Sequence, residues 1–494
     1  MPSILALDEG TTGATALLVR DDGRVVGHGY REFTQHFPQP GRVEHDPLEI
    51  LRVSLEAMRE AVERGGERPA ALGITNQRET VVLWDRATLQ PVAPAIVWQD
   101  RRTTARCREL REAGLEPMLR RRTGLMADPY FSATKLEWLL LDRELRRRAE
   151  AGELAFGTME SWLVASLTGG LHVSDHTNAS RTLLYNLATR SWDDDLLGLF
   201  SVPRRLMPEI VPSSGVLGDV KAEHLGFALP IAGLAGDQQA ALFGQACTRR
   251  GLAKNTYGTG AFLLVHAGDA VPEPGAGLLA TMACGPKGEP AYAVEGSVFV
   301  AGAAVQWMRD GLGLITSAAE TQALAESVPD TGGVAFVPAF VGLGTPHWEP
   351  EARGTITGLT RGTTKAHLVR AALEAMAFGT ADLLSAIQAG SGVEVPVLRV
   401  DGGASANDFL MQHQADLLGF PVERPTVLET TALGAAGLAG LATGMWQSMD
   451  EVLAAEGIRR FAPAMATADR RRRIAEWERA VAAALAWARW RPTH

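Results

Sequence analysis

Two turns built from glycine and threonine carry the chemistry that is easiest to interpret in this chain. The first, Asp8-Glu9-Gly10-Thr11-Thr12, follows an apolar run near the start, and the second, Gly258-Thr259-Gly260, lies between two apolar runs past the midpoint. Glycine allows the backbone to approach a ligand closely, and threonine hydroxyls and turn N–H groups form a concave site for anions. Two such turns predict two halves of one fold that close on a polyphosphate.

Three groups of charged residues have spacings that suit catalysis or binding. Asp8 ends an apolar run beside the first turn, where a carboxylate either caps the turn or holds Mg²⁺ through water. Asp237 precedes a helical stretch, and its spacing alone favours a helix N-cap over a general base. Arg78-Glu79 follows another apolar run and is either a surface ion pair or the donor and acceptor that a small polyol requires.

The elements that position these residues alternate between strands and helices. In the first half we expect three antiparallel strands within residues 4–30, a helix over 47–63 and a buried strand over 71–75. That last strand delivers residues 76–80 at its carboxyl end, where open α/β sheets bind ligands.

The second half repeats this plan. The expected elements are a hairpin over 256–265, a strand near 291–295, a helix over 302–308, a strand and glycine turn over 398–403, and a helix after residue 407. The chain is therefore predicted to be an α/β protein with two domains, residues 1–248 and 249–494.

Composition narrows the class of protein. The net charge of −9 argues against a general nucleic-acid binder, and the three cysteines fit neither a zinc site nor a disulfide framework, so we expect a reducing cytoplasm. The longest uncharged stretch, residues 430–449, is rich in glycine and alanine, which predicts a buried helix rather than a membrane span. No signal peptide is expected, and no GxxxxGK[ST] loop occurs.

With these segments in view, the chain resembles the glycerol kinases, which belong to the carbohydrate-kinase branch of the actin-like ATPase superfamily. The segments that carry the resemblance are DEGTT (8–12), GITNQRET (73–80), AIVWQDRRT (95–103), TNASRT (177–182), GDQQAALFGQ (236–245), KNTYGTG (254–260), DGGA (401–404) and TALGAA (431–436). The resemblance implies two ribonuclease-H-like, actin-like domains, each a mixed sheet flanked by helices, with a nucleotide cleft between them. It also implies phosphorylation of glycerol by ATP.

The resemblance assigns roles to matching positions. Asp237 becomes the general base, which revises the N-cap interpretation, and Asp8 and Asp237 would hold Mg²⁺. The residues that would bind glycerol are Arg78, Glu79, Trp98, Tyr130, Asp237, Gln238 and Phe262. The residues that would bind ATP are Gly10, Thr11, Thr12, Gly13, Thr259, Gly260, Gly302, Gln306, Gly403 and Asn407. Members of the family are often dimers or tetramers, so a homo-oligomer is expected.

The chain also departs from the family pattern. Glu9, Gly13 and Thr15 stand where the family usually has Gln, Ser and Arg, so the first turn loses a cation and gains a carboxylate. We expect weaker nucleotide binding or a stronger dependence on Mg²⁺. Residues 222–230 lack the arginine that some bacterial members use for fructose 1,6-bisphosphate, so no inhibition by that effector is expected.

Two alternative functions remain at this point. A kinase for another polyol or a pentulose would use the same scaffold, although the aromatic Trp98 and Phe262 favour a three-carbon acceptor. An actin-like ATPase without a small-molecule acceptor would need neither a polyol pocket nor a base aimed at a second substrate.

Overall fold

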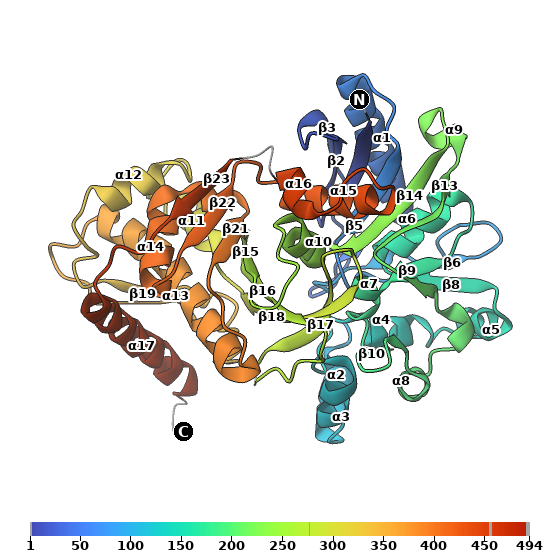
Figure 1. Cartoon of the computed structure of the whole chain (residues 1–494). Coiled ribbons are helices and arrows are strands. Elements are labelled where there is room, and N and C mark those ends of the chain that lie inside the picture. The colour runs from blue at the N-terminus through green and yellow to red at the C-terminus, as the bar shows by residue number, and fades with distance from the viewer. Residues whose placement is uncertain (1, 276, 454–456, 491–494) are drawn as a thin grey trace.

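The computed structural model describes residues 2–275, 277–453 and 457–490, and two large sheets organise them (Figure 1). The first sheet has the order β13-β14-β5-β1-β2-β3. Its strands are β1 (Ser3–Glu9), β2 (Gly13–Arg20), β3 (Val25–Glu32), β5 (Ala71–Asn76), β13 (Ser214–Val220) and β14 (Leu229–Gly236). β1, β2 and β3 form the predicted antiparallel meander, while β5 is parallel to both β1 and β14.

The predicted helix after the meander is α1 (Pro47–Gly65), and its ends follow from local chemistry. The Asp46 side chain accepts a hydrogen bond from the Leu48 amide, Pro47 occupies the first helical position, and Gly66 ends the helix with a positive φ of 66°. Its apolar residues pack on β2 and β3. α1 therefore covers one face of the first sheet.

The second sheet repeats the arrangement of the first. Its order is β17-β18-β16-β15-β21-β22-β23. Its strands are β15 (Ala253–Tyr257), β16 (Ala261–Gly268), β17 (Leu279–Cys284), β18 (Pro290–Val298), β21 (Leu398–Asp401), β22 (Val422–Pro425) and β23 (Ile458–Phe461). In both sheets three antiparallel strands lead into two parallel ones, β3-β2-β1-β5-β14 and β18-β16-β15-β21-β22. The predicted repeat and the α/β class are confirmed, whereas the boundary at residues 248 and 249 stays a prediction.

Two helices pack closely where the halves meet. α10 (Asp237–Gly244) begins at the end of β14, and α15 (Thr430–Ala442) lies across β14, β5 and β1 (Figure 1). A Cβ on Gly434 would lie 1.9 Å from the Ala240 carbonyl oxygen, and a Cβ on Gly244 would lie 2.0 Å from that of Thr430. The glycines are needed for this approach, and the predicted buried helix is confirmed.

Most of the remaining elements of the first half come between β5 and β13 in the chain. The helices are α2 (Thr104–Glu112), α3 (Glu116–Thr123), α4 (Ser132–Leu139), α5 (Arg143–Ala151), α6 (Met159–Thr168), α7 (His176–Ala179), α8 (Asp194–Leu199) and α9 (Ala222–Leu225). The short strand pairs are β4 (Glu44–His45) with β7 (Ala95–Ile96), β6 (Val82–Asp85) with β8 (Leu154–Gly157), β9 (Val173–Asp175) with β12 (Glu209–Val211), and β10 (Tyr185–Asn186) with β11 (Ser191–Trp192). Of these elements, β4 precedes α1, and α9 lies between β13 and β14.

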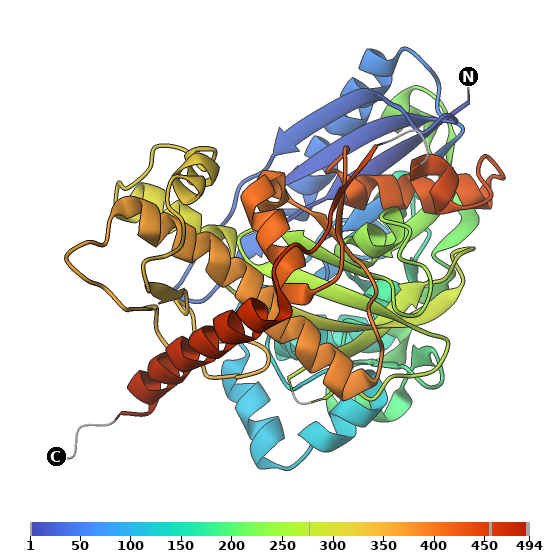
Figure 2. The same cartoon turned by 60° about the vertical axis from the view of Figure 1, so that its left-hand side comes forward.

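In the second half, further helices lie around the second sheet. They are α11 (Gly302–Gln306), α12 (Glu320–Glu326), α13 (Lys365–Ser391), α14 (Asp408–Leu418) and α17 (Thr467–Arg489). α16 (Met449–Leu453) instead packs with α15 against the first sheet. The helix predicted over 302–308 ends its α-helical part at Gln306 and continues as a π-helical turn over Trp307–Gly311. A small sheet pairs β19 (Ala335–Val337) with β20 (Thr355–Thr357), and α17 runs along the outside of this half toward the C-terminus (Figure 2).

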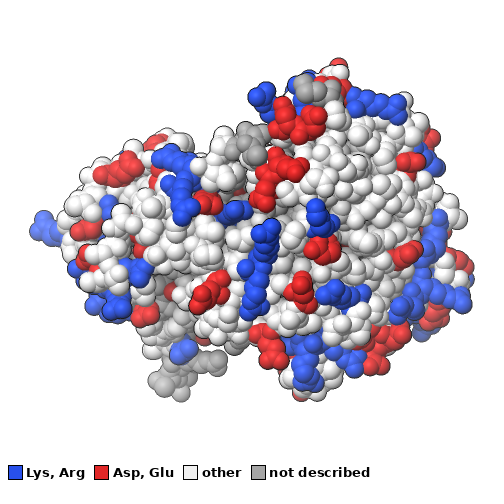
Figure 3. Space-filling view, in the orientation of Figure 1, with Lys and Arg blue, Asp and Glu red and all other residues white. Residues whose placement is uncertain are grey.

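Acidic and basic side chains are mixed over the face seen in Figure 3, without a broad region of one sign. Among the described residues, no helix combines the length and the apolar character that crossing a bilayer requires.

Candidate active site

Three neighbouring strands end at the same edge of the first sheet. Glu9 and Gly236 are the register partners of Asn76 from either side, so the carboxyl ends of β1, β5 and β14 are adjacent. Asp8, Arg78 and Asp237 therefore come together although their positions in the chain are far apart. The ends of parallel strands are the usual ligand site of open α/β sheets.

Asp8 and Asp237 are close enough for their charges to interact. Burial, and after it the charge of Asp237, raises the pKa of Asp8 to about 7. Asp237 is the first residue of α10, and its Oδ1 accepts a hydrogen bond from the Gln238 amide at 2.6 Å. Gly236 occupies the cap position, so the N-cap interpretation of Asp237 is wrong, and the Asp237 side chain is 28% exposed.

Arg78 and Glu79 are buried side chains, so the interpretation of these two as a surface ion pair is wrong. Arg78 Nε lies 3.1 Å from Asp237 Oδ1, and its two terminal nitrogens hold Glu295 at 2.6 and 3.0 Å. Glu79 has a positive φ of 63° and accepts a hydrogen bond from Arg181 Nε at 2.6 Å. A positive φ is uncommon for a residue with a side chain and is found at functional sites.

Trp98 and Tyr130 form an aromatic corner beside these charges. Their rings meet edge to face with centroids 5.5 Å apart, and Trp98 Nε1 donates to Thr11 Oγ1 at 3.0 Å. A hydrogen bond therefore joins Trp98, one of the residues predicted to bind glycerol, to Thr11 of the first glycine turn. Phe262 lies on β16 of the second half, and among the described residues no ring contact joins Phe262 to this corner.

Gln238 and Lys254 connect α10 to the second half. Lys254 Nζ donates to Gln238 Oε1 and, at 2.8 Å, to Thr256 Oγ1. Burial lowers the pKa of Lys254 to about 8, although Asp401 and Asp237 favour its charged form. A cation of the second half therefore lies near the proposed base.

The first turn explains one departure from the family pattern. The Gly10 amide donates to the Gly13 carbonyl at 3.0 Å, which closes the turn. A Cβ at position 13 would lie 2.7 Å from the Arg31 carbonyl oxygen and 2.9 Å from the Tyr30 ring. Serine would not fit here without movement of β3, so Gly13 follows from the close approach of the Arg31 backbone.

Glu9 is fully buried, on the opposite side of its strand from Asp8. Gln77 Nε2 donates to its Oε1 at 2.7 Å, and its Oε2 has no partner among the described residues. Burial raises the pKa of Glu9 well above its ordinary value, which favours the neutral acid. The expected repulsion between Glu9 and the phosphates requires an ionised Glu9 carboxylate. Burial of Glu9 disfavours that ionised form.

A pocket of about 600 Å³ lies beside the second turn. The predicted nucleotide residues that line it are Thr259, Gly302, Gln306, Gly403 and Asn407. Gly10, Thr11, Thr12 and Gly13 lie on the turn of the first half, and they and Gly260 are outside the lining of this pocket. The structure thus brings half of the predicted nucleotide residues into one cavity.

The comparisons with known proteins agree with this geometry. The model of the N-terminal domain of the FGGY family of carbohydrate kinases matches residues 3–244, and that of the C-terminal domain matches residues 253–443. The chain belongs to the FGGY family of carbohydrate kinases.

Relatives within the FGGY family match the chain over nearly its whole length. Glycerol kinase of Aromatoleum aromaticum is 56% identical and glycerol kinase 2 of Thermotoga maritima is 52% identical, each with 99% of both chains covered. A crystal structure of Plasmodium falciparum glycerol kinase with ADP superposes with a TM-score of 0.93, at 36% identity and with 98% of each chain covered. The two-domain fold implied by the sequence is therefore that of the FGGY kinases.

Sequence reasoning missed two charged residues of this FGGY site, Arg181 and Glu295. Arg181 lies inside the segment TNASRT, but no spacing pointed to its contact with Glu79. Glu295 had a usable signal, because it is the single charged residue of the otherwise apolar strand β18. A lone charge in a buried strand is normally paired, and its partners are worth seeking.

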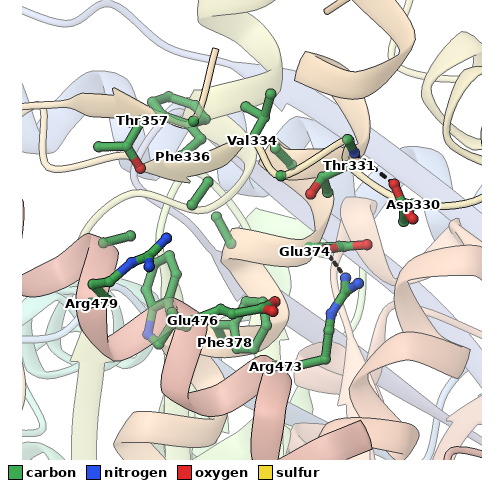
Figure 4. Close-up of a pocket in the computed structure, with 18 of the residues that line it drawn as sticks. Asp330, Thr331, Val334, Phe336, Thr357, Glu374, Phe378, Arg473, Glu476 and Arg479 are labelled. Atoms are coloured by element: carbon green, nitrogen blue, oxygen red, sulfur yellow. Dashed lines mark hydrogen bonds and ion pairs between the residues drawn. The ribbon is translucent and has the colours of Figure 1, made fainter. Parts of the chain in front are cut away.

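A second large pocket, of about 660 Å³, lies apart from the predicted residues (Figure 4). Glu476 and Arg479 of α17 line it opposite Phe336 and Thr357, and Arg473 is ion-paired with Glu374 of α13. None of the residues predicted for glycerol or ATP lines this pocket.

Proposed function

We propose that this FGGY kinase transfers the terminal phosphoryl group of ATP to a terminal hydroxyl of glycerol. The product is sn-glycerol 3-phosphate, and the reaction is the step by which glycerol enters catabolism. The observation that carries the proposal is the near full-length match, above 50% identity, to curated glycerol kinases. The buried Arg78 and Glu79, with the half-buried Asp237, supply the polar groups that such an acceptor needs.

The acceptor side of the reaction follows from the first half. Asp237 takes the proton of the attacking hydroxyl, while Arg78 and Glu79 give and accept hydrogen bonds to the polyol. Trp98 and Tyr130 cover its carbon chain and exclude water, and Gln238 and Phe262 complete the set. Positioning and charge stabilisation account for most of the catalysis in phosphoryl transfer.

The donor side draws on both halves. The pocket with Gly302, Gln306, Gly403 and Asn407 receives the nucleoside, and Thr259 and Gly260 approach its phosphates. The turn from Gly10 to Gly13 meets the phosphates from the other side. In this proposal the two halves approach the phosphates from opposite sides, and the second half also binds the nucleoside.

Magnesium fits the carboxylates beside the first turn. Burial, and after it the charge of Asp237, raises the pKa of Asp8 to about 7, so the two carboxylates are close enough for their charges to interact even though Arg78 is paired with Asp237. Among the described residues no group of three or more His, Cys, Asp or Glu side chains could hold a metal ion. Two carboxylates suit Mg²⁺, which keeps several waters and takes phosphate oxygens as ligands. Bound there, Mg²⁺ would neutralise the phosphate charge.

The location and assembly of the protein are parts of the same proposal. Cys107, Cys247 and Cys284 are buried thiols, which supports a reducing cytoplasm. A dimer or tetramer is the assembly we propose, and light scattering after gel filtration measures it directly.

A coupled assay for glycerol 3-phosphate, with glycerol, xylulose or no acceptor, tests the function. Wild type should turn over glycerol far faster than the pentulose and should hydrolyse little ATP alone. Asp237→Asn should lose about 10² to 10⁴-fold in kcat, because it removes the base.

The matched control is Asp219→Asn, at an exposed position of β13, which should keep its turnover. Near wild-type turnover of Asp237→Asn would overturn the base. Preference for xylulose would favour the pentulose alternative, and ATP hydrolysis indifferent to acceptors would favour an actin-like ATPase.

A further inference from the structure

Five buried or half-buried charged side chains form a continuous chain through the acceptor site. Asp237 contacts Arg78, Arg78 holds Glu295 with both terminal nitrogens, Arg181 Nη2 donates to Glu295 Oε1 at 3.1 Å, and Arg181 Nε donates to Glu79. Arg78 and Glu79, the proposed glycerol ligands, are thus both held through Glu295 and Arg181. Neither of these two contacts glycerol in the proposed function.

Glu295 differs from the other four residues because it belongs to the second half. It lies on β18, and its carboxylate reaches residues that precede it by 217 and 114 positions. β17, next to β18 in the sheet, lies against α7 and α10 of the first half (Figure 1). The position of Arg78 therefore depends on the second half of the molecule.

The strand that carries Glu295 also leads to the nucleotide pocket. After β18 ends, the Ala301 amide donates to the Thr259 carbonyl at 2.8 Å and the Gly302 amide donates to the Gly258 carbonyl at 2.9 Å. Gly302 and Thr259 line the nucleotide pocket. One short segment thus connects the second glycine turn to the carboxylate that holds Arg78.

The buried ion pairs of Glu295 resist separation from Arg78 and Arg181. Burial alone would raise the pKa of Glu295, but the charges of Arg181 and Arg78 hold it at about 2, so the carboxylate is ionised. Removing one partner of a buried ion pair leaves an uncompensated charge, which is strongly unfavourable. Arg78 and Arg181 are therefore constrained to follow Glu295 when β18 shifts.

Glu295 also limits how Arg78 interacts with the proposed base. Because both terminal nitrogens of Arg78 face Glu295, Asp237 receives only the single Nε contact at 3.1 Å. A two-pronged pair between Arg78 and Asp237 would bind the carboxylate more tightly. Glu295 thus leaves part of the Asp237 carboxylate free for the acceptor.

On the basis of the proposed function, we propose that Glu295 is a positioning residue that couples glycerol affinity to nucleotide occupancy. A nucleotide in the pocket fixes the segment from Gly258 to Gly302, which fixes β18 and, through Glu295, sets Arg78 and Arg181. Coupling between two binding sites is reciprocal, so glycerol raises nucleotide affinity by the same factor.

The test measures glycerol binding by calorimetry, with and without saturating ADP, for wild type and Glu295→Gln. We expect wild type to bind glycerol at least fivefold more tightly with ADP. In the variant this ratio should fall below twofold, while the Kd for ADP alone stays within twofold of wild type. Loss of a merely structural contact would weaken both ligands and leave the ratio unchanged.

Two further variants complete the design. Glu289→Gln changes an exposed acid next to the same strand and should keep the wild-type ratio. Uncharged hydrogen bonds from Ser180 and Gln239 to Thr281 also join the first half to β17, the strand beside β18. We therefore expect Glu295→Gln to fold. If Glu295→Gln does not fold, Arg181→Lys is the alternative. It keeps the positive charge but loses the paired guanidinium donors, and it should reduce the ratio of glycerol affinities with and without ADP in the same way.

The outcomes are separable. A wild type that binds no glycerol overturns the proposed function and the coupling together. A wild type that binds glycerol but shows no change with ADP, or a Glu295→Gln variant with the full wild-type ratio, overturns the coupling alone.

Discussion

At the scale of single residues, Thr15 is the position where one side chain is most directly expected to alter phosphate binding. Thr15 is the register partner of Asp8 across β1 and β2, so the two side chains share a face of the sheet. Thr15→Arg should strengthen ATP binding by about 1 kcal/mol, or roughly fivefold in Kd, because it adds a cation beside the phosphate turn.

Calorimetry with Mg-ATP measures this change. Thr15→Gln is the matched control, because it adds length and a donor without charge. If arginine leaves the ATP affinity unchanged or weakens it, the departure at Thr15 does not affect nucleotide binding.

Part of the candidate site could be predicted from single residues of the sequence, and part could not. Asp8 lies at the end of one strand and Arg78 and Asp237 follow two others. Neighbouring strands of one sheet place such residues at one edge, so their convergence was predictable. The partnership of Glu295 with Arg78 was not, because a lone acid in a strand gives no indication of which distant cation it meets. The turn sequence likewise showed that Gly13 departs from the family but not that the Arg31 backbone excludes a larger residue.

At the scale of elements, the crossing of α10 and α15 sets the position of Asp237, the proposed base. Gly434→Ala would place a Cβ 1.9 Å from the Ala240 carbonyl oxygen, and neither backbone can yield without separating the helices. Overpacking of this kind costs about 1–3 kcal/mol, so the free energy of unfolding should fall by that amount. Because α10 begins at Asp237, kcat should fall as well.

Urea denaturation and the glycerol assay measure the two effects of Gly434→Ala. Gly198→Ala is the control, because Gly198 lies in α8 and a Cβ there meets no atom within 4 Å. That control should be neutral or slightly stabilising. A fully active and stable Gly434→Ala would show that the crossing tolerates a wider spacing.

The elements themselves were largely predictable from periodicity and turn residues. The helix at 47–63, the strand at 71–75 and the hairpin at 256–265 all appear, since each has its pattern within a short window. The partner of α15 was not predictable, because glycine and alanine spacing reports a close approach without saying to what. The domain boundary could not be predicted for the same reason, because it depends on contacts between segments that are distant in the sequence.

At the scale of the whole molecule, the proposed base and the proposed nucleotide pocket belong to different halves. Asp237 follows β14 of the first sheet, while the pocket with Gly302 and Asn407 lies in the second half. Phosphoryl transfer requires the two to meet, so both ligands together should draw the halves closer.

Small-angle X-ray scattering with glycerol and a non-hydrolysable ATP analogue measures this closure. The radius of gyration should decrease when both ligands are present, and less when glycerol is added alone, which serves as the control. An unchanged radius with both ligands would mean that the halves are already in their working arrangement.

The packing of α15 on the first sheet has a consequence for how the chain folds during synthesis. α1 and α6 can cover one face of that sheet early, but the other face packs against apolar residues of α15. This face stays bare until the ribosome has made residues up to Ala442. A fragment that stops near residue 248 would therefore expose it permanently, and we expect such a fragment to aggregate unless the rest of the chain is supplied in trans.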